Sequence, residues 1–192
     1  MRASKSDRPL AWIDRMMTIS WLRFEWDLKK NPTDDLKVPS PFILSRAEKA
    51  DHDAVQKVAT NAFSMDTGWS DIQKIFAERI LRTVRAGFEK DPPDCLVVQH
   101  GSRIIGVSIV NPSVSAENHL TTGPCILQEY RGRGLGTVLL KASLAALRDA
   151  GLARAYGVAR DKTAAARFVY PKFGGSSGRW SPDFEVAQKL AA

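Results

Sequence analysis

Hydrophobic and polar residues alternate with two different periods along the chain. Between residues 22 and 28 every second side chain is apolar, which predicts a half-buried strand. From residue 42 onward, short apolar runs alternate with stretches in which apolar positions recur every three or four residues, the spacing of an amphipathic helix. This order predicts an α+β fold with a hairpin-rich first half and a second half that runs strand–turn–helix–strand–helix–strand.

The predicted strands are short and bounded by turn-forming residues. They cover residues 22–28, 42–44, 95–99, 104–111, 119–127, 154–159 and 184–190. A tight turn at 100–103 joins two of them as a hairpin. A helix connects the strand that ends at residue 127 to the strand that begins at 154, so we expect these two strands to be parallel.

Capping and stop signals separate the helical stretches. The predicted helices cover residues 51–63, 70–88, 135–150 and 163–173. Ser70 is the expected N-cap of the second helix, and the pair Pro92–Pro93 ends it. Gly151 stands at the expected C-cap of the third helix.

Residues 1–40 are interpreted as an N-terminal extension of a domain that spans residues 41–192. Turn residues at 31–35 and a stiff connector with Pro39 and Pro41 separate the two parts. We expect the tryptophans of the extension to pack against the domain, because large aromatic side chains mostly serve cores. They are Trp12, Trp21 and Trp26.

Composition excludes several classes of protein. The 192 residues are 44% hydrophobic and 26% charged, which is typical of a globular chain with a core. No run approaches the ~20 apolar residues of a membrane span, and the polar segment 1–8 lacks the apolar stretch of a secretory signal. Two cysteines and three histidines are too few for a disulfide framework or a plausible zinc site. We therefore expect a cytoplasmic protein without a metal and without a membrane partner.

The net charge of +7 favours binding of an anionic partner. Residues 126–192 carry eleven basic and five acidic side chains, so most of the surplus lies in the last third of the chain. No tract within it resembles a basic nucleic-acid tail. A nucleic-acid partner is therefore not expected.

One motif in this basic third carries recognisable chemistry. The sequence Arg-Gly-Arg-Gly-Leu-Gly-Thr at 131–137 lies between a predicted strand and a predicted helix. Helix N-termini present unpaired N–H groups and a partial positive charge, which together bind phosphates. Glycines let a phosphate approach the backbone, and Arg131 and Arg133 add positive charge. The motif therefore predicts a ligand that bears phosphate.

Two familiar phosphate loops do not match this motif. A Walker loop requires Gly-Lys-Ser/Thr, and no lysine precedes Thr137. In a dinucleotide-binding G-x-G-x-x-G that starts at Gly132, the last position would be Thr137, and Leu152 stands where an acidic residue is needed. A tight turn without any ligand is the structural alternative.

The residues around the motif resemble a known superfamily. Segment 128–140, centred on Arg131-x-x-Gly134-x-Gly136, resembles the acyl-CoA motif of the GNAT N-acetyltransferases. Segment 163–174 is similar to the second signature of that superfamily, and the resemblance covers about 150 residues. It implies a GNAT-like α+β fold: a mixed, mostly antiparallel central sheet of six to seven strands, about four flanking helices and an extra strand from the extension.

The resemblance also implies where acetyl-CoA would bind. The turn amides would hold the pyrophosphate, and the pantetheine would pair with the strand before the turn where that strand splays from its parallel neighbour. Pro124 is interpreted as marking a place where ladder pairing is interrupted, because proline lacks an N–H; an ordinary proline at the start of a strand is the alternative. The implied contacts are Cys125, Ile126, Leu127, Arg131, Gly132, Arg133, Gly134, Leu135, Gly136, Thr137 and Thr163.

Tyr170 occupies the position where the superfamily often places the acid that protonates the leaving CoA thiolate. A free tyrosine has a pKa near ~10, so it stays neutral at pH 7 and can donate a proton. Two residues depart from the pattern. Thr163 replaces a common asparagine, and Gly175 replaces a usual phenylalanine, a change expected to loosen the last strands.

A general base must take a proton from the acceptor ammonium. The candidates are Glu117 and His119, near the start of the strand that leads to the turn. The alternative is that both are ordinary exposed turn residues without a catalytic role. Cys125 is interpreted as a buried, unreactive thiol, because no histidine adjoins it. Acidic residues that could attract a cationic amine are Asp66, Asp71, Asp183 and Glu185.

These observations predict an N-acetyltransferase that uses direct attack of a primary amine on acetyl-CoA in a ternary complex. The expected partner is a small-molecule or peptide amine, and a homodimer stays open. A non-catalytic acyl-CoA-binding regulatory module is the alternative. It would keep the phosphate turn but would need neither Tyr170 nor a base.

Overall fold

The computed structural model describes residues 20–30, 37–66 and 73–180, with the backbone alone at 73–76. The described strands are β1 (Trp21–Asp27), β2 (Phe42–Arg46), β3 (Cys95–His100), β4 (Arg103–Ile109), β5 (Cys125–Ile126), β6 (Arg154–Arg160) and β7 (Ser176–Trp180). The helices are α2 (His52–Ser64), α3 (Gln73–Gly87) and α4 (Leu135–Asp149), with short turns η1 (Lys49–Asp51), η3 (Gln128–Tyr130) and the π-helical η4 (Ala165–Val169). The expected α+β class with seven strands is confirmed.

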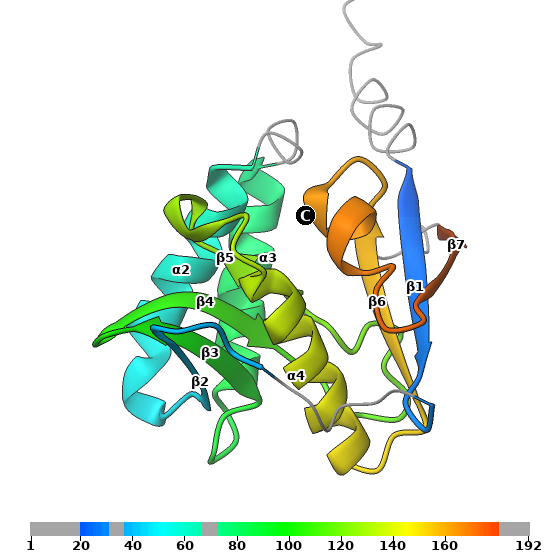
Figure 1. The fold of residues 1–192 in the computed structure, drawn as a ribbon, viewed down its shortest axis with the longest axis horizontal. Helices are drawn as coiled ribbons and strands as arrows, with labels where there is room; N and C mark the ends of the chain where they lie inside the picture. Colours follow the sequence, from blue (N-terminus) through cyan, green and yellow to red (C-terminus); the bar gives the residue numbers. More distant parts are fainter. Residues whose placement is uncertain (1–19, 31–36, 67–72, 181–192) are drawn as a thin grey trace, which may run out of the picture.

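The strands form two antiparallel sheets that lie next to each other (Figure 1). One sheet has the order β2-β3-β4-β5, and the other has the order β6-β1-β7. Helices α2 and α3 cover one face of the four-stranded sheet, while α4 crosses its other face (Figure 1). The buried face of α2 is the predicted one, with apolar side chains three and four residues apart: Val55, Val58, Ala59 and Ala62.

The two sheets separate at β5 and β6. The sequence predicts that these strands run parallel, and the family resemblance implies that they splay apart before the turn. In the described part of the chain β5 pairs only with β4, and β6 pairs only with β1. An open edge of β5 therefore faces the second sheet.

The predicted strand at 119–127 is wrong in its centre. Leu120 makes one isolated bridge to Val110, and only Cys125–Ile126 continue as β5. Between them Gly123 has φ +61°, and the Thr122 side-chain oxygen, rather than a backbone carbonyl, accepts the Ile109 N–H at 3.0 Å. Pro124 has no N–H to add. These local bonds replace the ladder just before the turn.

Strand β1 lies in the middle of its sheet. It pairs with β6 over its whole length and with β7 from Trp21 to Glu25. Phe24, Trp26 and Leu28 are buried, as their alternation predicts. The boundary at residue 40 stays a prediction. The strand within the predicted extension, β1, nevertheless belongs to the same sheet as β6 and β7.

Residues 163–180 differ from the predicted long helix. The helix is a single π turn, in which the Tyr170 N–H donates to the Ala165 carbonyl at 2.8 Å, and the unpredicted strand β7 follows. Gly175 does not leave a gap, because a Cβ there would lie 2.6 Å from the Trp26 Nε1 atom. The indole of Trp26 fills the space, so the expected loosening is replaced by an anchor from β1.

Some predictions lie outside the described residues: Trp12, the turn at 31–35, the Ser70 cap, Asp71, Asp183, Glu185 and the strand at 184–190. Among the helices that the structure describes, none has both the length and the apolar character needed to cross a membrane.

Candidate functional site

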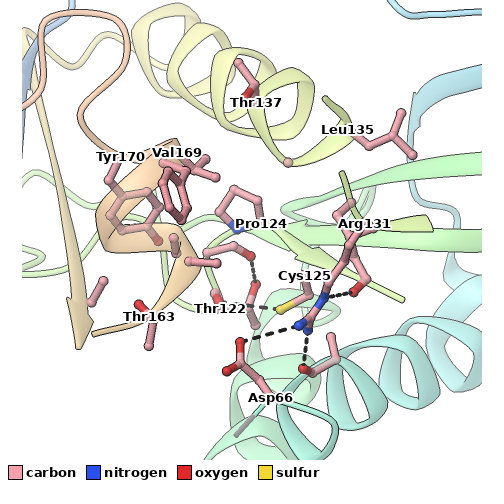
Figure 2. Close-up of a pocket in the computed structure, with 18 of the residues that line it drawn as sticks. Asp66, Thr122, Pro124, Cys125, Arg131, Leu135, Thr137, Thr163, Val169 and Tyr170 are labelled. Carbon is pink, nitrogen blue, oxygen red and sulfur yellow. Dashed lines mark hydrogen bonds and ion pairs between the residues drawn. The ribbon is translucent and has the colours of Figure 1, made fainter. Parts of the chain in front are cut away.

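A cavity of about 580 Å³ opens where the two sheets separate (Figure 2). Its walls come from the end of α2, from residues 120–126, from the turn and first residues of α4, and from the end of β6 with the segment through η4. The site is therefore built where β5 has no neighbour on one side. Residues distant in sequence meet here because both sheets end at the same gap.

The turn at 131–137 presents backbone donors to this cavity. Gly132 and Gly134 have φ of +78° and +79°, a left-handed conformation that glycine adopts at low cost. The N–H groups of residues 132–136 have no acceptor in the described part of the chain, whereas the Thr137 and Val138 N–H groups both donate to the Gly134 carbonyl. Consecutive N–H groups at a helix start that have no described acceptor are the type of backbone arrangement that binds anions.

Arg131 has a different role from the one the motif suggests. Its Nη2 donates to the Ala62 carbonyl at 2.7 Å and its Nε donates to the Ile126 carbonyl at 3.2 Å (Figure 2). Its Nη1 lies 3.6 Å from the Asp66 carboxylate. The side chain ties the turn to the end of α2 and to β5, so much of its charge is satisfied within the protein.

The edge of β5 offers a backbone donor next to the turn. The Leu127 N–H donates to the Ile105 carbonyl, and Ile126 lies opposite Gly106 in the ladder. In an antiparallel pair this alternation directs the Ile126 N–H and C=O away from β4. The Ile126 carbonyl already accepts a hydrogen bond from Arg131. The Ile126 N–H is therefore the backbone group that an extended ligand could bind.

Tyr170 stands across the cavity from β5 (Figure 2). The residue is 2% exposed, and its hydroxyl lies against Gly123, where any Cβ would collide with it. That hydroxyl has no hydrogen-bond partner in the described ranges. Burial, and to a lesser extent Cys125, raises the pKa of Tyr170 above its usual value, so the phenol keeps its proton at neutral pH.

Cys125 is buried in the cavity wall, and its thiol donates to the Thr122 carbonyl at 3.6 Å. Burial raises the pKa of the Cys125 thiol to about 12, although the nearby Arg131 opposes that shift. A protonated thiol is a poor nucleophile. The geometry agrees with its interpretation as an unreactive side chain.

The candidate bases Glu117 and His119 do not line the cavity. Glu117 is exposed. His119 is 1% exposed; its Nδ1 accepts the Tyr156 N–H at 2.9 Å and its Nε2 donates to the Ser113 carbonyl at 3.2 Å. Burial lowers the pKa of His119, which keeps the ring neutral. With both nitrogens engaged, His119 serves as a structural link between a loop and β6.

The remaining predicted contacts divide in the same way. Thr163 lines the cavity, but its hydroxyl donates to the Arg160 carbonyl at 2.8 Å and accepts the Ala166 N–H at 3.4 Å. Leu127 and Arg133 are not among the described lining residues. The predicted residues that do line it are Cys125, Ile126, Arg131, Gly132, Gly134, Leu135, Gly136, Thr137, Thr163 and Tyr170.

Lys172 is a lining residue that the sequence did not single out as a contact. Its ammonium donates to the Thr137 hydroxyl at 3.1 Å, which places a positive charge beside the free amides of the turn. The signal was its place two residues after Tyr170, within the second motif. Asp66 is the single carboxylate among the described lining residues.

Residues 58–174 match the acetyltransferase (GNAT) family. No curated protein matches the chain. The structure is similar to a GCN5-related N-acetyltransferase from Sphaerobacter thermophilus, with a TM-score of 0.61 at 18% identity over 84% of this chain and 49% of that one. It is also similar to a GNAT-family acetyltransferase from Colwellia psychrerythraea, with a TM-score of 0.52 at 14% identity over 84% of this chain and 53% of that one.

A third similar structure is a GCN5-related glucosamine N-acetyltransferase region of a fungal β-N-acetylglucosaminidase, with a TM-score of 0.53 at 15% identity. The alignment covers 93% of this chain and 22% of that one. The chain thus spans about half the length, or less, of these solved structures. At these identities the likeness concerns the fold.

Proposed function

Because the chain belongs to the acetyltransferase (GNAT) family, we propose that it transfers an acetyl group from acetyl-CoA to a primary amine by direct attack. The observation that carries this proposal is the row of five backbone amides at residues 132–136 that have no described acceptor, because four of these residues line the same cavity as Tyr170. Phosphate recognition and a proton donor are thereby combined in one site.

The donor set fits the anionic half of acetyl-CoA. The amides of residues 132–136 would hold the pyrophosphate, and Lys172 adds a charge next to them. The outward Ile126 N–H is available to an amide-bearing pantetheine arm along the free edge of β5. When bound, acetyl-CoA supplies the activated acetyl thioester.

Tyr170 is the proposed general acid. In the transfer, a bond forms between the amine nitrogen and the acetyl carbon while the carbon–sulfur bond breaks, and the Tyr170 hydroxyl gives its proton to the departing sulfur. Burial supports this role, since it keeps the phenol protonated throughout the neutral range. The hydroxyl also lacks a competing partner among described groups.

Asp66 is the proposed group for the acceptor amine. As the single described carboxylate of the cavity, it can orient an ammonium and take its proton. It also forms an ion pair with Arg131, whose Nη1 lies 3.6 Å from the carboxylate. The neighbouring apolar side chains of Phe63 and Phe168 favour an amine with an apolar body.

The proposal is tested by release of free thiol from acetyl-CoA in the presence of single amines. The panel contains phenethylamine, putrescine, glucosamine and a short peptide with a free N-terminus. We expect turnover with at least one amine, and a decrease in kcat of about 100-fold in Tyr170→Phe, the scale of lost acid catalysis. The KM for acetyl-CoA should stay within about twofold.

Two outcomes would count against the proposal. Full turnover by Tyr170→Phe across neutral pH would remove the general-acid assignment. Binding of acetyl-CoA without turnover of any amine in the panel would instead favour a non-catalytic acyl-CoA-binding module.

A further inference from the structure

Two aromatic side chains of β1 lie directly behind Tyr170. The ring centres of Phe24 and Trp26 are 5.2 and 5.4 Å from the Tyr170 ring, with interplanar angles of 81° and 83°. The two rings are themselves stacked at 6.1 Å and 20°. They form one aromatic surface on which the phenol stands edge to face, a favoured geometry for aromatic pairs.

Strand β1 also holds the backbone that follows Tyr170. The Trp26 indole N–H donates to the Lys172 carbonyl at 3.0 Å. Gly175 packs so closely on this indole and on the Tyr170 carbonyl that a Cβ would have to displace them. Trp26 therefore contacts both the Tyr170 ring and the backbone two residues later, at Lys172.

The direction of the Tyr170 hydroxyl depends on this packing. No hydrogen bond within the described ranges holds the hydroxyl, which packs against Gly123. The contacts of the ring with Phe24 and Trp26, together with Gly123, are then what keeps the oxygen at the cavity wall. Both Phe24 and Trp26 come from the strand that the sequence assigns to the N-terminal extension.

We propose that Phe24 and Trp26 are positioning residues, which hold the Tyr170 ring so that its hydroxyl faces the reacting thioester. This inference rests on the proposed function, since it concerns the acid of that reaction. An acid that is displaced by about 1 Å can lose about 100-fold in rate. The strand β1 would then be part of the active site without touching either substrate.

A double-mutant cycle with Phe24→Leu and Tyr170→Phe tests the proposal, with acetyl-CoA and the panel amine of highest turnover. Phe24→Leu should lower kcat by about tenfold while the KM for acetyl-CoA stays within about twofold. In the Tyr170→Phe background the same change should alter kcat by less than about twofold, because there is no acid left to position.

The cycle separates this inference from the proposed function. If Tyr170→Phe alone leaves kcat unchanged, the acid assignment fails. If Tyr170→Phe is slow but Phe24→Leu lowers kcat equally with and without the Tyr170 hydroxyl, the positioning role is overturned while the acid stays. Should Phe24→Leu not fold, Trp26→Phe completes the same cycle, because it removes only the bond to Lys172 and part of the ring contact.

A second readout does not need activity. In protein labelled with ¹³C at the tyrosine ε carbons, a held ring gives two separate ε signals, whereas a fast-flipping ring gives one. We expect two signals for Tyr170, merging in Phe24→Leu or Trp26→Phe. Unchanged separate signals in both variants would contradict the proposal. Leu28→Val is the control for a general loss of core volume, because Leu28 is 1% exposed in the same hydrophobic cluster but is not one of the two aromatic rings of β1.

Discussion

At the scale of single residues, the cavity separates side chains that hold the site together from those left to react. Arg131 carries charge but satisfies two carbonyls and faces Asp66, so it fixes the turn. The Thr163 hydroxyl is engaged with the Arg160 carbonyl and the Ala166 N–H. The Tyr170 hydroxyl and the backbone N–H groups of residues 132–136 have no such partners among the described residues. These groups can therefore interact with a ligand.

His119 leads to a prediction about stability and pH. Burial lowers its pKa in the folded protein, so below the unfolded value near ~6.5 the unfolded chain binds a proton that the folded chain does not. The free energy of unfolding should therefore fall as the pH drops through and below 6.5, by up to about 1.4 kcal/mol per pH unit from this group.

Thermal melts of the protein and of His119→Gln between pH 7 and pH 5 measure this contribution. The variant should be less stable at pH 7 but should lose less on acidification. His52→Gln is the control, since His52 is only half-buried and lies on a helix start. Parallel pH curves for the protein and His119→Gln would show that His119 does not titrate this way.

At the scale of elements, period and turn chemistry were sufficient for most strands and for α2 and α4. These two signals did not predict the structure correctly at two places. The Thr122 hydroxyl ends the ladder before β5, and a π turn replaces the predicted helix at 163–173. The alternation in β1 predicted a strand correctly, but periodicity cannot say which strand it pairs with, and β1 proved to be central.

The central place of β1 gives a test with a matched pair of variants. Each interior residue of a strand paired on both sides donates its N–H to a neighbour, so Glu25→Pro should lose a ladder bond. Glu25→Thr also removes the ion pair with Arg154 but keeps the N–H. We expect the proline variant to unfold with at least about 2 kcal/mol less stability than the threonine variant in urea. Coincident unfolding curves would contradict the central position of β1.

At the scale of the whole molecule, the two sheets leave a gap that only the assembled fold reveals. The sequence predicted the phosphate turn and Tyr170 from their motifs, but the open edge of β5 depends on pairings far apart in the chain. The same holds for Lys172 beside Thr137 and for Phe24 and Trp26 behind Tyr170. Local patterns could not show that a strand from residues 21–27 backs a residue at 170.

The basic surplus of the last third fits this arrangement. Residues 126–192 carry most of the net charge of +7, and the turn with Lys172 lies within them. An anion at the start of α4 would be stabilised by the free amides, by the helix dipole and by this lysine together. We therefore expect acetyl-CoA to bind at the start of α4.

Isothermal titration calorimetry of acetyl-CoA into the protein, Gly134→Glu and Gly151→Glu tests that claim most directly. Both glycines are left-handed, at φ +79° and +92°, both have open space where a Cβ would lie, and they stand at opposite ends of α4. The strain is thus matched, and only Gly134→Glu brings a negative charge to the phosphate site. We expect Gly134→Glu to weaken binding at least about 100-fold and Gly151→Glu to stay within about twofold of the protein. Equal affinity of the two variants would contradict the account.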